Sequence, residues 1–309
     1  MITIDLITGF LGSGKTTFLK RYADYFLRQG QHIGLLVNDY GAVNVDRMLL
    51  QELQGDYCDI ETVAGACDAD CHRRRFKTKL IAMGMSGYDR VLVEPSGLFD
   101  TDEFFDTLRE APLDDWYRIG AVLTIAEAGL SEELSEESVY WLASQASQAG
   151  TILLSKTQLV PPERTAAAEA YLRTVTETFC GRPLTCPVIK RPWTELTDAD
   201  FASIANSGFR QADFIKRYQG HSSYGSLYYM NQTLTSQQLR ALAEALLTDA
   251  ACGHVCRIKG YIREQDTWIA CNADSYAVTL EPAEQGQNIL LVIGESLQKP
   301  VIDRYFQAL

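Results

Sequence analysis

The residues with the clearest chemical potential lie in one glycine-rich stretch near the amino terminus, TGFLGSGKTT. Gly9, Gly12 and Gly14 let the backbone pass close to a polyphosphate, whose charge is stabilised by main-chain N–H groups and by the dipole of a following helix. In this spacing Lys15 would bridge the β- and γ-phosphates, and the Thr16 hydroxyl would bind Mg²⁺. The stretch therefore predicts a site for a nucleoside triphosphate.

Two further positions would complete such a site. Glu94 follows an apolar run, where an acidic side chain would hold Mg²⁺ or its waters. Gly97, three residues later, would reach the γ-phosphate through its backbone N–H. Asp39 follows another apolar run and is a candidate to bind a metal ion or to position the attacking water. The other loop residues that we expect to contact the nucleotide are Ser13 and Thr17.

Alternating apolar runs and helical patterns predict the elements that position these residues. The expected strands are 2–7, 32–38, 58–62, 88–93, 118–125, 151–155 and 188–189. The expected helices between them are 16–28, 72–83, 133–149 and 161–179. Such alternation favours an α/β fold, a P-loop domain whose mainly parallel sheet is covered by helices and binds ligands at the carboxyl ends of its strands.

The composition changes after this alternating region. We expect the P-loop domain to cover residues 1–195 and a polar, glycine-dotted linker to cover 196–224. Further strand patterns and two helical patterns then predict a small α+β domain over 225–309.

Four segments in order carry a resemblance to a known family. The glycine-rich loop, NDYG from Asn38, EPSGL from Glu94 and RIKG from Arg257 resemble the CobW-like family of metallochaperone GTPases, which are relatives of HypB and UreG. The resemblance covers most of the chain, including the C-terminal domain. It implies slow hydrolysis of GTP, coupled to delivery of a metal ion, often zinc or cobalt, to a client metalloprotein or a cofactor-pathway protein.

The base-reading loop departs from the family pattern, which is Asn-Lys-x-Asp. Here Ser155 and Gln158 replace the Asn and the Asp, while Lys156 is kept and can lay its stem along the base. A neutral amide offers one carbonyl oxygen where the family carboxylate accepts two hydrogen bonds from guanine. The change is expected to relax discrimination between bases by roughly 1 to 3 kcal/mol. GTP is the expected nucleotide, and ATP stays open.

The metal-binding motif also departs from the family pattern, Gly-Cys-x-Cys-Cys. The corresponding segment keeps two thiols, Cys67 and Cys71, with His72 beside them. Soft thiolate and imidazole ligands suit Zn²⁺ or Co²⁺, and Asp68 or Asp70 would complete the set. The alternative is a remodelled loop with two cysteines that bind no metal. Cys252, His254 and Cys256 lie at alternate positions and would share one face of an extended strand. Core packing is the favoured explanation for them, and metal binding is the alternative.

Composition limits the partners. A formal net charge of −12 argues against nucleic acid and anionic lipid as partners. The amino terminus lacks the pattern of a secretory signal, and no apolar run is long enough to span a bilayer. We therefore expect a cytoplasmic location, where the eight cysteines would be reduced.

Two other functions stay open, a P-loop kinase acting on a small molecule and a non-catalytic nucleotide-dependent metal sensor or scaffold.

Overall fold

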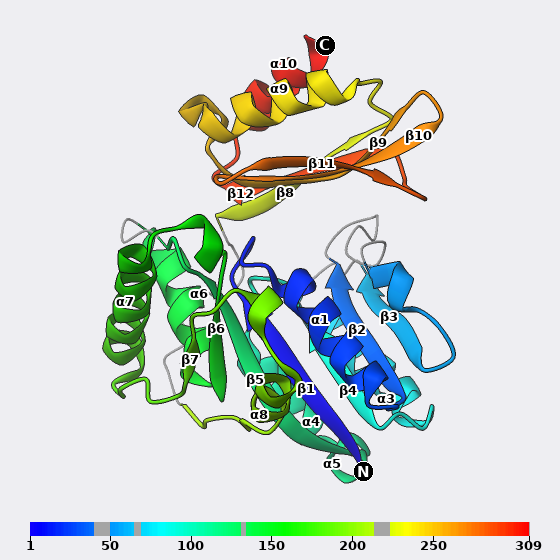
Figure 1. The fold of residues 1–309 in the computed structure, drawn as a ribbon, viewed down its shortest axis with the longest axis vertical. Helices are drawn as coiled ribbons and strands as arrows, with labels where there is room; N and C mark the ends of the chain where they lie inside the picture. Colours follow the sequence, from blue (N-terminus) through cyan, green and yellow to red (C-terminus); the bar gives the residue numbers. More distant parts are fainter. Residues whose placement is uncertain (40–49, 65–68, 131–133, 213–222, 309) are drawn as a thin grey trace. The chain divides into compact units, whose positions relative to one another are not determined.

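The computed structural model describes residues 1–39, 50–64, 69–130, 134–212 and 223–308 (Figure 1). The chain forms two compact units, Met1–Gln219 and Gly220–Leu309. No helix in the described ranges combines the length and apolar character that a bilayer crossing requires.

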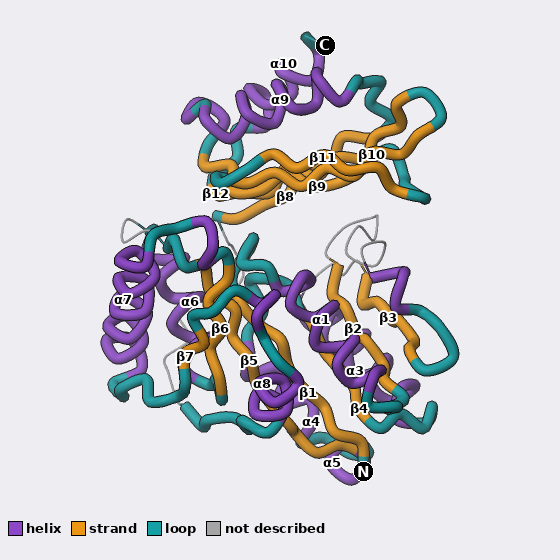
Figure 2. Tube along the Cα trace, in the orientation of Figure 1, coloured by secondary structure: helices purple, strands orange, loops and turns teal. Residues whose placement is uncertain are grey.

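A parallel sheet forms the centre of the first unit (Figure 2). Within the described ranges its strands are β1 (Ile2–Gly9), β2 (Ile33–Asp39), β3 (Cys58–Ala64), β4 (Arg90–Glu94), β5 (Tyr117–Glu127), β6 (Thr151–Ser155) and β7 (Val188–Ile189). Their order is β3-β2-β4-β1-β5-β6-β7, and every pairing is parallel. The predicted parallel sheet is confirmed, and the glycine-rich loop follows its central strand.

Helices cover both faces of this sheet. In the described part of the unit they are α1 (Lys15–Arg28), α3 (Ala69–Gly84), α4 (Thr101–Leu108), α5 (Leu113–Trp116), α6 (Glu136–Ser147), α7 (Pro162–Cys180) and α8 (Asp198–Ala205). Successive side chains of a strand point to opposite faces, so Ile7 packs with α1 and α8, whereas Ile4 and Leu6 pack with α3, α4 and α5. Helices α6 and α7 pack on Ile152 and Leu154 of β6.

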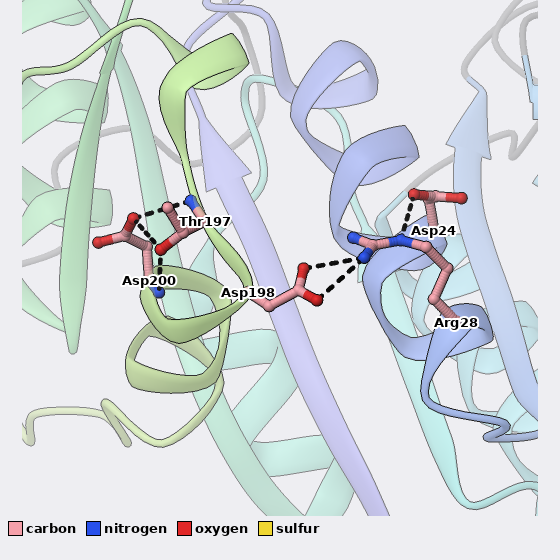
Figure 3. Close-up of polar contacts among 5 residues, drawn as sticks. All are labelled: Asp24, Arg28, Thr197, Asp198 and Asp200. Atoms are coloured by element: carbon pink, nitrogen blue, oxygen red, sulfur yellow. Dashed lines mark hydrogen bonds and ion pairs between the residues drawn. The ribbon is translucent and has the colours of Figure 1, made fainter.

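The predicted linker at 196–224 is wrong over its first part, because that part contains α8. The helix begins with a capping box, in which Thr197 and Asp200 satisfy each other's backbone N–H groups (Figure 3). Phe201 and Ile204, one turn apart, lie in the core against α1. The stretch as far as Ala205 is therefore part of the first unit. Helices α4 and α5 were also not predicted.

An ion pair on the surface connects α8 with α1. The Arg28 guanidinium of α1 lies 2.9 Å from the Asp198 carboxylate and 3.0 Å from that of Asp24 (Figure 3). These side chains are about half exposed, so water screens each pair and each contributes little to stability. The apolar contacts of α8, rather than this ion pair, hold it on the sheet.

The second unit is an antiparallel sheet packed against two helices. Its described strands are β8 (Tyr224–Met230), β9 (His254–Glu264), β10 (Thr267–Asp274), β11 (Val278–Ala283) and β12 (Ile289–Glu295), in the order β11-β10-β9-β12-β8. Its helices are α9 (Ser236–Thr248) and α10 (Lys299–Gln307), whose apolar side chains share one core with the sheet. This arrangement is a small α+β fold.

Glycine at one position of the RIKG segment is a packing requirement of this sheet. Gly260 has a φ of 146°, and a Cβ there would lie 2.0 Å from the carbonyl oxygen of Ile289 on β12. Any larger residue would separate β9 from β12, so this glycine serves the fold of the second unit.

The central strand of the first unit carries a buried carboxylate, Asp5, that is the centre of a charged hydrogen-bond network. Asp5 of β1 is fully buried, and its carboxylate accepts hydrogen bonds from Arg90 (2.5 Å), from the Tyr22 hydroxyl (2.8 Å) and from the Ala121 N–H (2.8 Å). These donors come from β4, α1 and β5. The pKa of Asp5 lies above its usual value, because the effect of burial, which raises this pKa, outweighs the effect of the Arg90 charge, which lowers it.

We predict that Asp5→Ala lowers the free energy of unfolding by about 3 to 5 kcal/mol, because it leaves Arg90 and two neutral donors without their acceptor. Chemical denaturation of both proteins measures the difference. The matched control is Asp24→Ala, which breaks an exposed aspartate–arginine pair and should lower the free energy of unfolding far less. Equal losses in the two variants would contradict the importance of the buried network.

The raised pKa also predicts a pH dependence. An acid whose pKa is higher in the folded state contributes stability that is present below its unfolded pKa and is lost as the pH rises through its folded value. The stability of the parent relative to Asp5→Asn should therefore decrease as the pH rises from 3.8, the ordinary value for this group. Denaturation curves at a series of pH values test this, and a relative stability that increases with pH would refute it.

Candidate functional site

The loop between β1 and α1 has a backbone that depends on glycine. Gly9, Gly12 and Gly14 all have positive φ values, of 145°, 77° and 96°. A Cβ on Gly9 would lie 2.3 Å from the carbonyl oxygen of Ile125 in β5, and one on Gly14 would lie 3.2 Å from the Trp193 ring. The loop therefore follows a path that other residues could take only with strain.

Lys15 extends back over this loop. Its ammonium group donates hydrogen bonds to the carbonyl oxygens of Gly9 (3.0 Å) and Phe10 (3.3 Å), and the residue is buried. A positive charge is thus held beside the main-chain N–H groups of a tight loop at a helix N-terminus. This combination attracts a polyphosphate.

The next residue joins the loop to the neighbouring strand. The Thr16 hydroxyl donates a hydrogen bond of 2.8 Å to Glu94, and both residues are buried. Glu94 is the last residue of β4, which pairs with β1, so the sheet brings together two oxygen donors that are 78 residues apart in sequence. A hydroxyl and a carboxylate are oxygen ligands of the kind that Mg²⁺ prefers, so these two residues fit the predicted metal role.

The turn after β4 lies directly against the loop. A Cβ on Gly97 would lie 2.5 Å from the backbone nitrogen of Leu11, so only glycine allows this approach. The carbonyl oxygen of Gly97 accepts a hydrogen bond of 2.9 Å from Gln145 of α6. The structure thus brings Gly97 beside the glycine-rich loop, and its contact with a terminal phosphate stays a prediction.

The segment after β6 carries the predicted base-reading residues. Ser155 is buried at the end of the strand, whereas Gln158 is exposed in a short 3-10 helix. Lys156 has a φ of 59°, and its ammonium group lies 2.5 Å from Glu127. A Cβ on Gly12 would be 3.7 Å from the same carboxylate, so the pair lies beside the glycine-rich loop.

Glu127 was not predicted from the sequence. It is the last residue of β5 and pairs in register with Ser155. The available signal in the sequence was that Glu127 lies at the carboxyl end of a predicted strand, as Ser155 does. The carboxyl ends of β5 and β6 are neighbours because these strands are adjacent in the sheet, and this order of strands was not predicted from the sequence.

Buried polar atoms that lack a hydrogen-bond partner indicate whether a polar ligand such as a nucleotide fits beside the loop. Among the described residues, the buried hydroxyls of Ser13 and Ser155 have no hydrogen-bond partner in the protein. Buried polar atoms are normally satisfied, so these two favour a polar ligand at the site. The glycine backbone, Lys15 and the paired oxygens of Thr16 and Glu94 all agree with a nucleoside triphosphate as that ligand.

Three predicted residues have side chains that the structure does not describe. Asp39 ends β2 and is placed by its backbone alone. Cys67 lies outside the described residues, as does Asp68. The roles predicted for these side chains stay predictions.

The other two predicted metal ligands are on α3. Cys71 is half-buried, and His72 is buried with its Nδ1 atom 3.3 Å from Glu103 of α4. Within the described ranges, no three side chains of His, Cys, Asp or Glu are grouped to hold a metal ion. The metal site at Cys67, Cys71 and His72 therefore stays a prediction.

The second candidate set is not arranged as expected. Cys252 belongs to a short helical turn and lies in the core of the second unit, where burial raises the pKa of its thiol. The strand begins only at His254, whose Nδ1 atom lies 3.8 Å from the Cys256 sulfur. The three residues therefore do not share one face of an extended strand, and Cys252 is a core residue.

Known proteins resemble this chain in sequence. Over 172 residues it is 27% identical to the zinc chaperone YeiR of Escherichia coli strain K12, which covers 55% of this chain and 51% of that protein. Over 166 residues it is 28% identical to the zinc chaperone YjiA of the same strain, covering 51% and 50%. The chain spans about half the length of the curated relatives that it matches.

Solved structures resemble it as well. The zinc-bound YjiA GTPase from E. coli matches with a TM-score of 0.42 and 19% identity, over 100% of this chain and 98% of that chain. HypB from Helicobacter pylori in complex with nickel matches with a TM-score of 0.42 and 14% identity, over 66% and 84%.

A family model described as CobW/HypB/UreG, nucleotide-binding domain, matches residues 3–179. The match includes the glycine-rich loop, Glu94, Gly97 and the segment after β6. Since it covers more than half of the chain, this protein belongs to the CobW/HypB/UreG family.

Proposed function

We propose that this protein binds and slowly hydrolyses GTP, and that it couples the nucleotide state to handling zinc or cobalt for a client protein. The observation that carries the nucleotide part is the group formed by the glycine-rich loop, Lys15 and the Thr16–Glu94 hydrogen bond. The names of the relatives, zinc chaperones YeiR and YjiA, support the metal part. We also propose a cytoplasmic location.

The proposed chemistry is attack of water on the γ-phosphate. The loop N–H groups and Lys15 would stabilise the charge that develops on the phosphate oxygens. Thr16 and Glu94 would hold Mg²⁺, which supplies further positive charge at these oxygens when bound. Asp39 would position the water, and Gly97 would respond to the presence of the γ-phosphate.

The base would lie against the segment after β6. Ser155, Lys156 and Gln158 are the residues proposed to contact it, and the pair of Lys156 with Glu127 supports this because it holds the lysine beside the loop. Gln158 is exposed and supplies no carboxylate. We propose that the preference for GTP over ATP is weak for this reason.

Metal would bind at Cys67, Cys71 and His72. The proposed ligands begin α3 or directly precede it, between the segments that follow β2 and β4. A segment in this position can respond to the nucleotide. The second unit, a separate α+β fold, is proposed to dock the client or to move with the nucleotide state.

The first prediction from the proposed function is that Lys15→Ala lowers the rate of GTP hydrolysis by at least about 100-fold, because it removes a charge that stabilises the transition state. Release of inorganic phosphate in the presence of Mg²⁺ measures it. The matched control is Lys20→Ala on the same helix, which breaks an exposed pair with Glu52 and should leave hydrolysis unchanged. Turnover by Lys15→Ala at the parent rate, with thermal unfolding unchanged, would refute the assignment of this loop.

The second prediction concerns the base. Gln158→Asp should raise the ratio of GTP to ATP affinity, by a free energy of roughly 1 to 3 kcal/mol, because a carboxylate accepts two hydrogen bonds from guanine. Competition binding with both nucleotides measures the ratio. Gln158→Asn is the control, since it has the size of Asp without the charge and should leave the ratio low. A parent protein that prefers GTP by several orders of magnitude would show that another group reads the base.

The third prediction concerns the metal. The double variant Cys67→Ala/Cys71→Ala should lose stoichiometric Zn²⁺, and the affinity of the parent for Zn²⁺ should fall as the pH drops, because thiolate ligation releases protons. Cys180→Ala removes a half-buried thiol elsewhere and should bind metal like the parent. Elemental analysis after dialysis gives the stoichiometry. Retention of one tightly bound zinc by the double variant would place the site elsewhere.

A further inference from the structure

The segment that follows β7 places an aromatic ring beside the glycine-rich loop. Strand β7 is parallel to β6 and adjacent to it, so the residues that follow the two strands lie at the same edge of the sheet. A Cβ on Gly14 would lie 3.2 Å from Cη2 of the Trp193 indole and 3.6 Å from the Cβ atom of Ser155. Trp193 is therefore next to the loop and next to the first residue proposed to contact the base.

The residues just before this ring connect the segment to two helices. Lys190 pairs with Glu169 of α7 at 2.7 Å. Arg191 pairs with Asp200 of α8 at 2.5 Å. A short 3-10 helix then begins at Trp193. The position of the ring is thus defined by contacts of its own segment before any ligand is bound.

Packing accounts for part of the Trp193 side chain but not for all of it. The ring meets Phe18 of α1 edge to face, with centroids 5.4 Å apart, and the residue is half-buried. A purely apolar ring would serve this packing as well. The indole N–H is buried without a hydrogen-bond partner among the described residues, as are the hydroxyls of Ser13 and Ser155. Because buried polar atoms are normally satisfied, these three together indicate a polar ligand beside Gly14.

An aromatic ring beside a phosphate-binding loop suits the base of a nucleotide. Bases stack on aromatic side chains, and the contact tolerates guanine and adenine alike because every base has a π-face. The segment after β6 supplies no carboxylate to read guanine, since residue 158 is a glutamine. Stacking would supply affinity for the base without that carboxylate.

We propose that Trp193 is the residue on which the base of the bound nucleotide stacks, and that it gives guanine and adenine nucleotides a similar gain in affinity. Ser155 and Lys156 contact the base from the segment after β6, and Trp193 contacts it from the segment after β7. This proposal rests on the proposed function, since it takes the glycine-rich loop as the site of the phosphates.

The test compares ligands with and without a base. The affinities of the full chain for GDP, for ADP and for inorganic pyrophosphate are measured by calorimetry in the presence of Mg²⁺. Trp193→Leu, which keeps an apolar side chain against Phe18, should weaken the binding of GDP and of ADP by roughly 5-fold to 100-fold each. Its affinity for pyrophosphate should stay within about twofold of the parent value, because pyrophosphate has no base to stack. Trp193→Phe, which keeps an aromatic ring, should recover most of the affinity for both nucleotides.

The matched control is Trp116→Leu. Trp116 ends α5 directly before β5, at the opposite edge of the sheet from the loop. It is also a half-buried tryptophan beside a glycine, since a Cβ on Gly84 would lie 2.5 Å from its ring. This variant should bind GDP, ADP and pyrophosphate like the parent. Thermal unfolding of each variant shows whether a change in affinity comes from a loss of folding.

The outcomes separate this proposal from the proposed function. A Trp193→Leu protein that binds GDP like the parent overturns the role of Trp193 and leaves the nucleotide site in place. An equal loss of affinity for GDP and for pyrophosphate also overturns it, because Trp193 would then support the loop rather than the base. The same holds if Trp193→Phe binds GDP no better than Trp193→Leu, or if Trp116→Leu loses as much affinity. A parent that binds neither GDP nor pyrophosphate overturns the proposed function, and this proposal with it.

Discussion

The candidate site depends on the pairing of β1 with β4. This parallel pairing places the end of β4 beside the loop that follows β1, and it allows the Thr16 hydroxyl to reach Glu94 at 2.8 Å. Without it, Thr16 would not reach this carboxylate. The buried carboxylate of Asp5 on β1 supports this pairing, because it accepts one hydrogen bond from each of β4, α1 and β5. The elements that carry the loop are thus held together by one charged network as well as by apolar packing.

Close packing of the backbone extends this arrangement to the rest of the site. Gly9 and Gly97 occupy positions where a Cβ would collide with the main chain of another segment. The loop, the end of β5 and the turn after β4 therefore approach one another at distances that only glycine permits. Such an arrangement has little freedom to adjust gradually, so a ligand that needs more room must move a whole segment. The turn at Gly97 is the segment that leads to α4 and so to His72.

Much of the first unit was predictable from the sequence because its signals are local. The apolar runs gave the strands, and the glycine-rich loop lies between its strand and helix as expected. Helix α8 was missed although its signal was present, since Thr197 and Asp200 have capping-box spacing and Phe201 and Ile204 lie one turn apart. The polar residues and glycines that follow it concealed an eight-residue helix.

The remaining contacts could not be predicted because they join residues that only the fold makes neighbours. Lys156 meets Glu127 because β5 and β6 are adjacent, and His72 meets Glu103 because α3 and α4 pack on the same face. Neither pair has a sequence spacing that indicates contact. The same limit applies to Cys252, whose alternate spacing with His254 and Cys256 suggested one extended face, whereas a helical turn places it in the core.

The central claim is that this arrangement hydrolyses GTP with the help of Mg²⁺. The most direct measurement is a single-turnover assay in which the purified full chain, in excess, is mixed with GTP labelled at the γ-phosphate, with and without Mg²⁺. The account predicts slow release of the label as inorganic phosphate that requires Mg²⁺. Failure to release phosphate although GTP is bound, or transfer of the label to a small-molecule acceptor, would contradict it.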